Sequence, residues 1–340
     1  MNNHILYKDN TKNKEISVIV PIYNAEDKIE NCICKLLCND CSLEIILVDD
    51  GSTDSSLKIC NKLQEIYFNK IRVFHKENGG VSSARNIGLK NSLGEIITFA
   101  DIDDYFEEHA LDCIVEEMKK NKVDVLIWDY YIKTNDKIKL CSYWIQDNKN
   151  TCKLEDIKRN YWSLVINGVF NPVWNKAFKG NIIREHEVKF DENIIFSEDA
   201  LFNILFLKHS ENIYHIDKGL YYYVINEGSA TQRRQPEYYR MLDHTFNKIE
   251  AFLGDNILEA QGNQHYGEWL SVIKQTIYHQ KYNLFNKKEI EDNKRTKKML
   301  KFFTPITLRE KIEIFLIRNN GLYVYCWLKK MKQQIKIIKK

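Results

Sequence analysis

The chain has 340 residues, of which 44% are hydrophobic and 12% aromatic. This composition supplies a packed core and excludes a disordered or low-complexity protein. The formal charge of +3 has two unequal parts, because residues 301–340 carry ten basic and two acidic side chains whereas residues 1–300 have a net charge of −5. The overall charge by itself argues neither for nor against a polyanionic partner, and we expect no nucleic acid.

The apolar runs and the cysteines bear on the compartment. The longest apolar runs fall short of the ~20 residues that span a bilayer, and the polar residues 1–14 do not resemble a signal peptide. Nine irregularly spaced cysteines suit a reducing compartment, so we expect a cytoplasmic protein. Cys38 and Cys41 have CxxC spacing, but no second Cys or His pair follows at zinc-ligand spacing, and we assign them no metal.

Between Pro21 and Pro172, buried-strand patterns alternate with amphipathic helix patterns. Strands are predicted at 16–20, 45–48, 71–74, 96–99 and 123–127. Helices are predicted at 25–37, 55–67, 82–93 and 111–120. The alternation predicts an α/β fold with a mostly parallel sheet flanked by helices. From about Pro236 onward only helical periodicity remains, which predicts a C-terminal helical region.

Polar residues follow each of the first four predicted strands, where a parallel sheet has its ligand crevice. Asp49 and Asp50 follow the second strand, and Asp101, Asp103 and Asp104 follow the fourth. These carboxylates would repel one another unless a cation lay between them. A divalent ion such as Mg²⁺ or Mn²⁺ is the simplest candidate, although a solvated acidic turn has the same residues.

The segment from Asn78 to Gly88 opens a predicted helix with glycines and hydroxyl residues and carries Arg85 in its first turns. Free backbone N–H groups at a helix start and a guanidinium suit an anionic ligand. A capped helix with a surface arginine is the alternative for an isolated match of this kind.

Taken together, these stretches resemble glycosyltransferase family 2, the inverting nucleotide-sugar transferases of the GT-A fold. The resemblance covers roughly Ile16 to Thr231 in unbroken order. It is carried by residues 18–24, 48–54, 78–88, 101–104, 173–176, 189–192, 197–203, 221–223 and 229–231.

The resemblance implies a set of site residues. Tyr23 and Asp49 would contact the nucleobase, usually uracil, and Asn78 and Arg85 would hold the base or the diphosphate. The implied nucleotide-sugar site contains Pro21, Tyr23, Asn24, Asp49, Asp50, Asn78, Arg85, Asp101 and Ile102. Asp103 would bind the Mn²⁺ or Mg²⁺ directly, with Asp101 contacting the ribose or a metal-bound water.

The resemblance also assigns the acceptor side. Asp199 matches the general base, which takes the proton of the acceptor hydroxyl, and Glu198 would orient that base or the acceptor. Ser197 is a good N-cap for the helix that carries both, and helix-start carboxylates without a catalytic role are the alternative. The implied acceptor side includes Trp174, Asn175 and Lys176.

Some positions depart from the family pattern or fall outside it. Ile102 stands where a small serine is common, and Val224 replaces an arginine often found after the tyrosine triplet. We interpret His109 and His215 as surface or packed histidines, because we recognise no paired carboxylate or cysteine spacing beside either.

The resemblance and the periodicity together predict a polar arm at 1–14, a GT-A catalytic domain at 15–235 and a helical region at 236–340. The catalytic domain would have a nucleotide-binding half at 15–105 and an acceptor half at 106–235. The last helix would be basic and amphipathic, with Val324, Leu328, Met331, Ile335 and Ile338 on one stripe among lysines. Such a helix suits an anionic membrane surface at the inner face of the cell membrane, and a docked helix with a solvated lysine face is the alternative.

These features favour an inverting, metal-dependent transfer from a nucleotide-sugar, usually a UDP-sugar, to a glycan or lipid-linked oligosaccharide in capsule, lipopolysaccharide or related surface polysaccharide synthesis. A catalytically inactive glycan- or nucleotide-binding relative is an alternative. A phosphoacceptor signalling domain would place its acidic pair after the first strand. A sugar nucleotidylyltransferase would need a glycine-rich basic loop after that strand, whereas residues 21–25 read Pro-Ile-Tyr-Asn-Ala.

Overall fold

The computed structural model describes residues 14–142, 150–225, 238–279 and 293–319. The chain divides into two compact units, Met1–Ser229 and Ala230–Lys340. The predicted motif at 229–231 and the predicted basic helix at the end of the chain lie outside the described residues.

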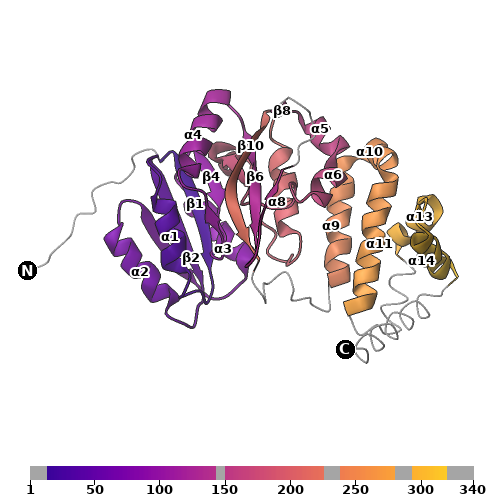
Figure 1. Cartoon of the computed structure of the whole chain (residues 1–340), viewed down its shortest axis with the longest axis horizontal. Helices are drawn as coiled ribbons and strands as arrows, with labels where there is room; N and C mark the ends of the chain where they lie inside the picture. Colours follow the sequence, from indigo (N-terminus) through magenta and orange to yellow (C-terminus); the bar gives the residue numbers. More distant parts are fainter. Residues whose placement is uncertain (1–13, 143–149, 226–237, 280–292, 320–340) are drawn as a thin grey trace, which may run out of the picture. The chain divides into compact units, whose positions relative to one another are not determined.

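The first unit alternates strands and helices, and the described part of the second is helical (Figure 1). The elements of the first unit are β1 (Ile16–Ile22), α1 (Ile29–Leu37), β2 (Leu43–Asp50), α2 (Ser56–Ile66), β3 (Ile71–Lys76), α3 (Val81–Asn91), β4 (Ile96–Phe99), β5 (Tyr105–Phe106), α4 (Ala110–Asn121), β6 (Val125–Lys133), β7 (Ile138–Cys141), β8 (Thr151–Cys152), α5 (Leu154–Arg159), α6 (Tyr161–Ile166), β9 (Lys176–Lys179), α7 (Gly180–Glu185), α8 (Glu198–Leu207) and β10 (Ile213–Val224). Those of the second are α9 (Tyr238–Leu253), α10 (Asp255–Ala260), α11 (Gly262–His279), α13 (Lys294–Phe302) and α14 (Leu308–Arg318).

The described strands form one ten-stranded sheet in which β3, β2, β1 and β4 are neighbours and run parallel. Beyond β4 the sheet is mixed, because β9 lies between β4 and β6 and is antiparallel to both. The α/β fold and its mostly parallel sheet are as predicted, because β6 and β10 also pair in parallel and run in the direction of β1 to β4, with β9 antiparallel between β4 and β6. The four residues of β9, Lys-Ala-Phe-Lys, are too few for a recognisable strand pattern.

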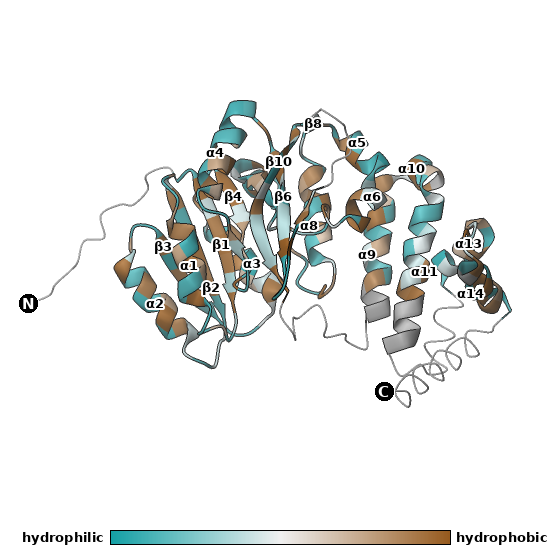
Figure 2. Cartoon of the chain, in the orientation of Figure 1, coloured by the Kyte–Doolittle hydropathy of each residue, from teal (hydrophilic) through white to brown (hydrophobic). Residues whose placement is uncertain are grey.

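Helices cover both faces of the sheet. Successive side chains of a strand point to opposite sides, so a strand that is apolar throughout needs a packing partner on each face. Val18 of β1 belongs to a buried cluster with residues of α1, α2 and α4, whereas Ile19 lies against Gly88 of α3. Phe99, the register partner of Ile19 on β4, packs edge-to-face on Phe202 of α8 at 5.6 Å between ring centroids. The helices α3 and α8 therefore share one face of the sheet. Figure 2 colours the strands and helices by hydropathy, with hydrophobic residues in brown.

The predicted elements of the first half are present with shifted ends. The helix expected from residue 25 begins at Ile29, because residues 25–28 form a turn closed by the Lys28 N–H on the Ala25 carbonyl at 2.9 Å. The strand expected at 123–127 extends instead from Val125 to Lys133.

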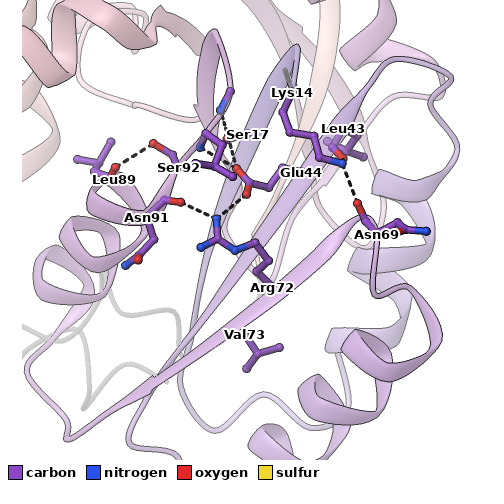
Figure 3. A network of polar contacts seen from close by, with 12 residues as sticks. Lys14, Ser17, Leu43, Glu44, Asn69, Arg72, Val73, Leu89, Asn91 and Ser92 are labelled. Atoms are coloured by element: carbon purple, nitrogen blue, oxygen red, sulfur yellow. Dashed lines mark hydrogen bonds and ion pairs between the residues drawn. The ribbon is translucent and has the colours of Figure 1, made fainter. Parts of the chain in front are cut away.

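A buried glutamate joins the strands at their amino ends, opposite the edge where their carboxyl ends lie (Figure 3). The Glu44 carboxylate is 1% exposed and accepts hydrogen bonds from Ser17 Oγ at 2.6 Å, Leu93 N at 3.0 Å and Arg72 NH1 at 2.7 Å. Arg72 also donates to the carbonyl of Asn91 at 2.7 Å. This network ties β1, β2 and β3 to the end of α3 and so fixes that helix on the sheet.

A buried arginine organises the described part of the second unit. Arg295 of α13 is 4% exposed, donates hydrogen bonds to Asp243, Asn247 and Glu250 of α9, and lies over the ring of Trp269 at 4.6 Å. Because a buried charge is costly unless paired, these contacts join three helices. Within the described residues, no helix is both long enough and apolar enough to cross a bilayer.

Gly88 allows the close approach of α3 to the sheet. A Cβ at this position would lie 2.3 Å from Cγ2 of the buried Ile19, a β-branched side chain with little room to move. We expect Gly88→Ala to lower the free energy of unfolding by about 1–3 kcal/mol, as overpacking does. Gly267→Ala in α11 is the matched control, because its Cβ would meet Phe303 at an ordinary 3.7 Å and should stabilise the helix. Denaturant unfolding measures both, and equal stability of the Gly88 variant and wild type would contradict this packing argument.

Candidate active site

The carboxyl ends of β1, β2 and β4 meet at one edge of the sheet, since these strands are parallel neighbours. Three polar segments recognised in the sequence, at 21–24, 49–54 and 101–104, therefore lie at the same edge (Figure 1). The helix α3 begins beside them, after Gly79 and Gly80, with the glycine at 80 in the left-handed region at φ 88°.

A buried guanidinium connects the segment after β4 with the start of α8. Arg85 of α3 is 3% exposed, and its NH2 donates to Asp101 at 3.0 Å while its NH1 donates to Asp199 at 2.7 Å. Glu198 is 3.7 Å from NH1, and the guanidinium lies over the ring of Phe190 at 5.3 Å. Acidic residues about 100 positions apart in the sequence thus share one cation.

The environment of these carboxylates separates their roles. Burial raises the pKa of Glu198 to about 8, with the charge of Asp199 adding to the effect and Arg85 opposing it. Burial also raises the pKa of Asp199, which Arg85 opposes. Burial lowers the pKa of Arg85, but the charges of Asp199, Asp101 and Glu198 together raise it. The raised pKa favours the protonated form of Glu198, whereas Asp199 has the direct hydrogen bond to the guanidinium.

The segment 101–104 after β4 contacts Lys28 on one side and residues of β10 on the other. Asp103, with its side chain 41% exposed, pairs with Lys28 at 2.8 Å. The buried Asp104 accepts hydrogen bonds from Val224 N at 2.8 Å and from the Tyr221 hydroxyl at 3.2 Å, and burial raises its pKa to about 8. The Tyr221 hydroxyl oxygen also accepts from Asp101 N at 3.0 Å.

Asp50 is predicted to bind a nucleotide-sugar, but its carboxylate is hydrogen-bonded to other residues of the chain. Its carboxylate accepts hydrogen bonds from Lys76 Nζ at 2.6 Å, Gly79 N at 2.9 Å and Gly80 N at 2.8 Å. The amide of Asn78 donates to the Asp50 carbonyl at 3.0 Å. Asp50 and Asn78 therefore shape the loop that leads into α3, and the Asp50 carboxylate keeps little capacity for a ligand.

Asp49 has an unused acceptor. Its Oδ2 is held by His75 Nδ1 at 2.8 Å and by Ser52 N at 3.3 Å, while its Oδ1 is buried without a hydrogen-bond partner in the described part of the chain. His75 was not predicted, and its position at the end of β3, one strand away from Asp49, is the signal that sequence reasoning could have used.

The remaining predicted donor-side residues differ in exposure. Tyr23 is 52% exposed at the end of β1. Asn24, at φ 46°, accepts from Thr53 N at 2.8 Å and so joins the loops after β1 and β2. Pro21 lies within β1, and Ile102 packs partly buried against the core rather than facing a ligand.

The three predicted acceptor-side residues are buried. Trp174 stacks on Tyr221 at 4.7 Å between centroids. Asn175 is fully buried and Lys176 is 2% exposed, and both side chains bond to nearby backbone carbonyls. Their burial gives no support to a direct contact with an acceptor.

Ser197 precedes α8 as predicted, but its side chain makes no capping hydrogen bond. Its backbone is in the left-handed region at φ 65°, unlike the extended conformation from which an N-cap hydroxyl reaches back into the first turn. The expected cap is therefore wrong.

Both histidines interpreted as lacking paired carboxylates do have them. His109 contacts Asp112 at 3.0 Å, and buried His215 contacts Asp129 at 2.9 Å and Asp217 at 3.2 Å. With Asp40, these residues form the two described groups of three ligand-type side chains close enough to hold an ion. Their contacts are hydrogen-bonded pairs within the fold, so we assign them no ion.

A family model described as glycosyl transferase family 2 matches residues 17–179. The chain is 34% identical over 224 residues to the uncharacterized glycosyltransferase EpsJ of Bacillus subtilis, covering 64% of this chain and 63% of EpsJ. It is 32% identical over 247 residues to the minor teichoic acid biosynthesis protein GgaA of the same organism, covering 68% of this chain and 50% of GgaA. The chain thus spans less than two thirds of either relative. It is 31% identical over 223 residues to the glycosyltransferase GlyG of Streptococcus pneumoniae, covering 63% of this chain and 72% of GlyG.

The fold is similar to that of a crystal structure of S. aureus TarS 1–349 in complex with UDP-GlcNAc. The TM-score is 0.64 at 20% identity, with 94% of this chain and 92% of that chain covered. At this identity the similarity supports the GT-A fold and nothing finer.

Arg85 should control stability in a pH-dependent manner. In Arg85→Gln, Glu198 and Asp199 lose the charge that opposes the rise of their pKa values, so the folded-state pKa values rise further above the unfolded values. The folded variant then holds protons that the unfolded chain releases, and its deficit in unfolding free energy grows as pH rises from about 5 to 9, to the order of 3 kcal/mol.

Denaturant unfolding at several pH values measures this deficit. Lys119→Gln is the matched control, since it removes an exposed pair with Glu15 that should contribute little. A pH-independent deficit for Arg85→Gln would show that the guanidinium does not govern these carboxylates.

Proposed function

Because this chain belongs to glycosyl transferase family 2, we propose that it is an inverting, metal-dependent transferase that moves a sugar from a UDP-sugar to a hydroxyl of a glycan or lipid-linked oligosaccharide. The observation that carries the proposal is the Arg85 bridge, which joins Asp101 after β4 to Asp199 on α8. A donor-side carboxylate and a carboxylate suited to act as a base thus lie on either side of one guanidinium.

Two features favour a uridine nucleotide. The buried Oδ1 of Asp49 lacks a partner in the described residues, and an unpaired buried acceptor is costly, so the ring N–H of uracil is a fitting donor. The exposed ring of Tyr23, at the end of the neighbouring strand, offers an apolar surface to a base. The solved TarS structure binds UDP-GlcNAc, a donor of this class.

Asp101 and Asp103 fit a hard divalent cation. Their side chains are 35% and 41% exposed, and each uses Oδ1 for its ion pair with Arg85 or Lys28. Two carboxylates leave further positions of Mg²⁺ or Mn²⁺ for water and for the donor phosphates. When bound, the ion would neutralise charge that develops on the leaving diphosphate.

Asp199 is proposed as the general base and Glu198 as its neighbour that stays protonated. Arg85 opposes the rise that burial causes in the pKa of Asp199, and the raised pKa strengthens Asp199 as an acceptor of the hydroxyl proton. Attack by that hydroxyl on the sugar carbon, opposite the leaving diphosphate, is a single displacement that inverts the anomeric centre. The transition state would resemble that of glycoside hydrolysis.

Substitutions at the two carboxylates separate binding from chemistry. We expect Asp199→Asn to lower kcat by about 10²- to 10⁴-fold while UDP affinity is unchanged, because the carboxylate would act only on the acceptor. Asp103→Asn should abolish the Mn²⁺-dependent part of the thermal shift by UDP. Asp136→Asn, at an exposed carboxylate, is the control. Turnover of a panel of UDP-sugars and thermal shifts with and without Mn²⁺ measure these effects, and undiminished turnover in both site variants would contradict the assignment.

The acceptor and the place of action form a second part of the proposal. The similarity to GgaA, a minor teichoic acid biosynthesis protein, favours a growing cell-surface polymer such as capsule or lipopolysaccharide units. We propose that the chain works at the inner face of the cell membrane as a peripheral protein. The predicted basic helix at 320–340 lies outside the described residues, so the support comes from α14.

The solvent-exposed side of α14 is apolar and basic. Leu308, Ile312 and Phe315 are 74%, 51% and 64% exposed and recur at helical spacing, whereas Ile314 and Ile317 on the opposite side are buried. Residues 294–318 contain eight Lys or Arg against two Glu. Exposed apolar side chains among basic ones suit an anionic lipid surface.

Vesicle flotation tests this placement. Phe315→Asp and deletion of residues 320–340 should each reduce co-flotation with vesicles that contain phosphatidylglycerol, and neutral phosphatidylcholine vesicles should bind weakly. Phe68→Asp, at a 68% exposed phenylalanine of the first unit, is the matched control. Equal flotation of wild type and both variants would contradict the proposal.

A further inference from the structure

The segment 169–173, between α6 and β9, accepts hydrogen bonds from buried amide and ammonium groups. Asn175, Lys176 and Asn203 are at most 2% exposed, and their donors point at the backbone carbonyls of this segment. The Val169 carbonyl accepts from Asn175 Nδ2 at 3.2 Å and from Lys176 Nζ at 2.8 Å. Segment 169–173 is thus fixed by these side chains together with the hydrogen bonds of the Val169 and Phe170 N–H groups to the Leu164 carbonyl of α6.

Asn203 bonds the middle of the same segment. Its Nδ2 donates to the carbonyls of Phe170 at 2.7 Å, Asn171 at 3.0 Å and, more weakly, Pro172 at 3.3 Å. The Pro172 carbonyl also accepts from Lys176 Nζ at 2.6 Å. Three consecutive carbonyls therefore depend on one asparagine of α8.

The end of this segment reaches Asp199. The backbone N–H of Val173 is among the groups that oppose the rise of the Asp199 pKa. Asp199 and Asn203 are four residues apart on α8, so they lie on the same side of the helix, one turn apart. Asn203 therefore bonds the segment to α8 one turn away from Asp199.

Lys176 can donate all of these hydrogen bonds only as a protonated ammonium group. Its Nζ contacts three oxygen acceptors, Val169 O, Pro172 O and Asn175 Oδ1 at 2.8 Å. An ammonium has three N–H donors for them, whereas a neutral amine has two. Burial lowers the pKa of Lys176, and the nearby charge of Asp199 opposes that shift. The lysine and the aspartate therefore favour each other's charged forms across the segment.

We infer that Lys176 and Asn203, with Asn175, are positioning residues for the reaction: they hold segment 169–173 against α8 one turn from Asp199, and so fix the place of the Asp199 carboxylate relative to the acceptor hydroxyl. This rests on the proposed role of Asp199 as the base. It gives the Asn-Lys pair of the sequence motif at 174–176 an internal role in place of acceptor contact. A small misplacement of a catalytic group costs a large factor in rate, so the effect should appear in kcat rather than in donor binding.

Steady-state kinetics with a panel of UDP- and GDP-sugars and Mn²⁺ tests the inference on the full chain. Lys176→Met and Asn203→Ala should each lower kcat at least tenfold, with the donor KM and the UDP affinity within twofold of wild type. Introduced into Asp199→Asn, either substitution should lower the residual kcat less than twofold, since both act through that carboxylate. A merely structural role would not produce this loss of effect.

Asn39→Ala is the matched control. Asn39 is also a buried asparagine that joins backbone groups, the Leu36 carbonyl and the Leu111 N–H, each at 2.9 Å, but it has no bond to segment 169–173. It should cost stability and leave kcat within twofold.

The outcomes separate the two levels of the proposal. If Asp199→Asn lowers kcat by about 10²- to 10⁴-fold but the kcat losses of Lys176→Met and Asn203→Ala stay below tenfold, or recur in full in the Asp199→Asn background, the inference is wrong and the proposed function stands. If the wild-type chain turns over no donor of the panel, or Asp199→Asn is fully active, the proposed function fails and the inference fails with it. Should Lys176→Met not fold, Asn203→Ala decides by the same criteria.

Discussion

The arrangement of this site depends on one buried cation. The Arg85 guanidinium loses its hydration inside the first unit, and such a loss is tolerated only when charges of opposite sign compensate for it. Asp101 comes from the end of β4 and Asp199 from the start of α8, so the compensation joins two parts of the chain that the sequence keeps far apart. The guanidinium and the carboxylates therefore fix one another, and removing the carboxylates would leave a buried cation without a partner.

Each carboxylate has a second, internal support that explains why it stays in place. The backbone N–H of Asp101 bonds to the Tyr221 hydroxyl, and Trp174 stacks on that tyrosine. Asn203, one turn after Asp199 on α8, bonds segment 169–173, and Lys176 bonds the Pro172 carbonyl of the same segment. Residues of one motif, Trp174 and Lys176, thus support both sides of the Arg85 bridge, one by aromatic packing and one by hydrogen bonding.

Sequence patterns predict which residues lie at the end of a strand, but not which groups become their hydrogen-bond partners. Asp49 and Asp50 are consecutive aspartates, yet Asp50 is satisfied by Lys76 and two loop N–H groups, while Oδ1 of Asp49 has no hydrogen-bond partner among the residues that the structure describes. The parallel half of the sheet was predictable because its strands are buried on both faces and apolar throughout. Partners such as Tyr221 could not be predicted, because they depend on how distant segments of the fold meet.

The central claim is that Arg85 and Asp199 work as one unit, and a double-mutant cycle tests it most directly. The measurement is kcat/KM for a UDP-sugar in wild type, Arg85→Ala, Asp199→Asn and the double variant. Coupled residues give strongly non-additive losses, so the double variant should be little worse than Asp199→Asn alone. Losses that multiply would mean that Arg85 serves the donor independently of Asp199, and would contradict the coupling drawn from the structure.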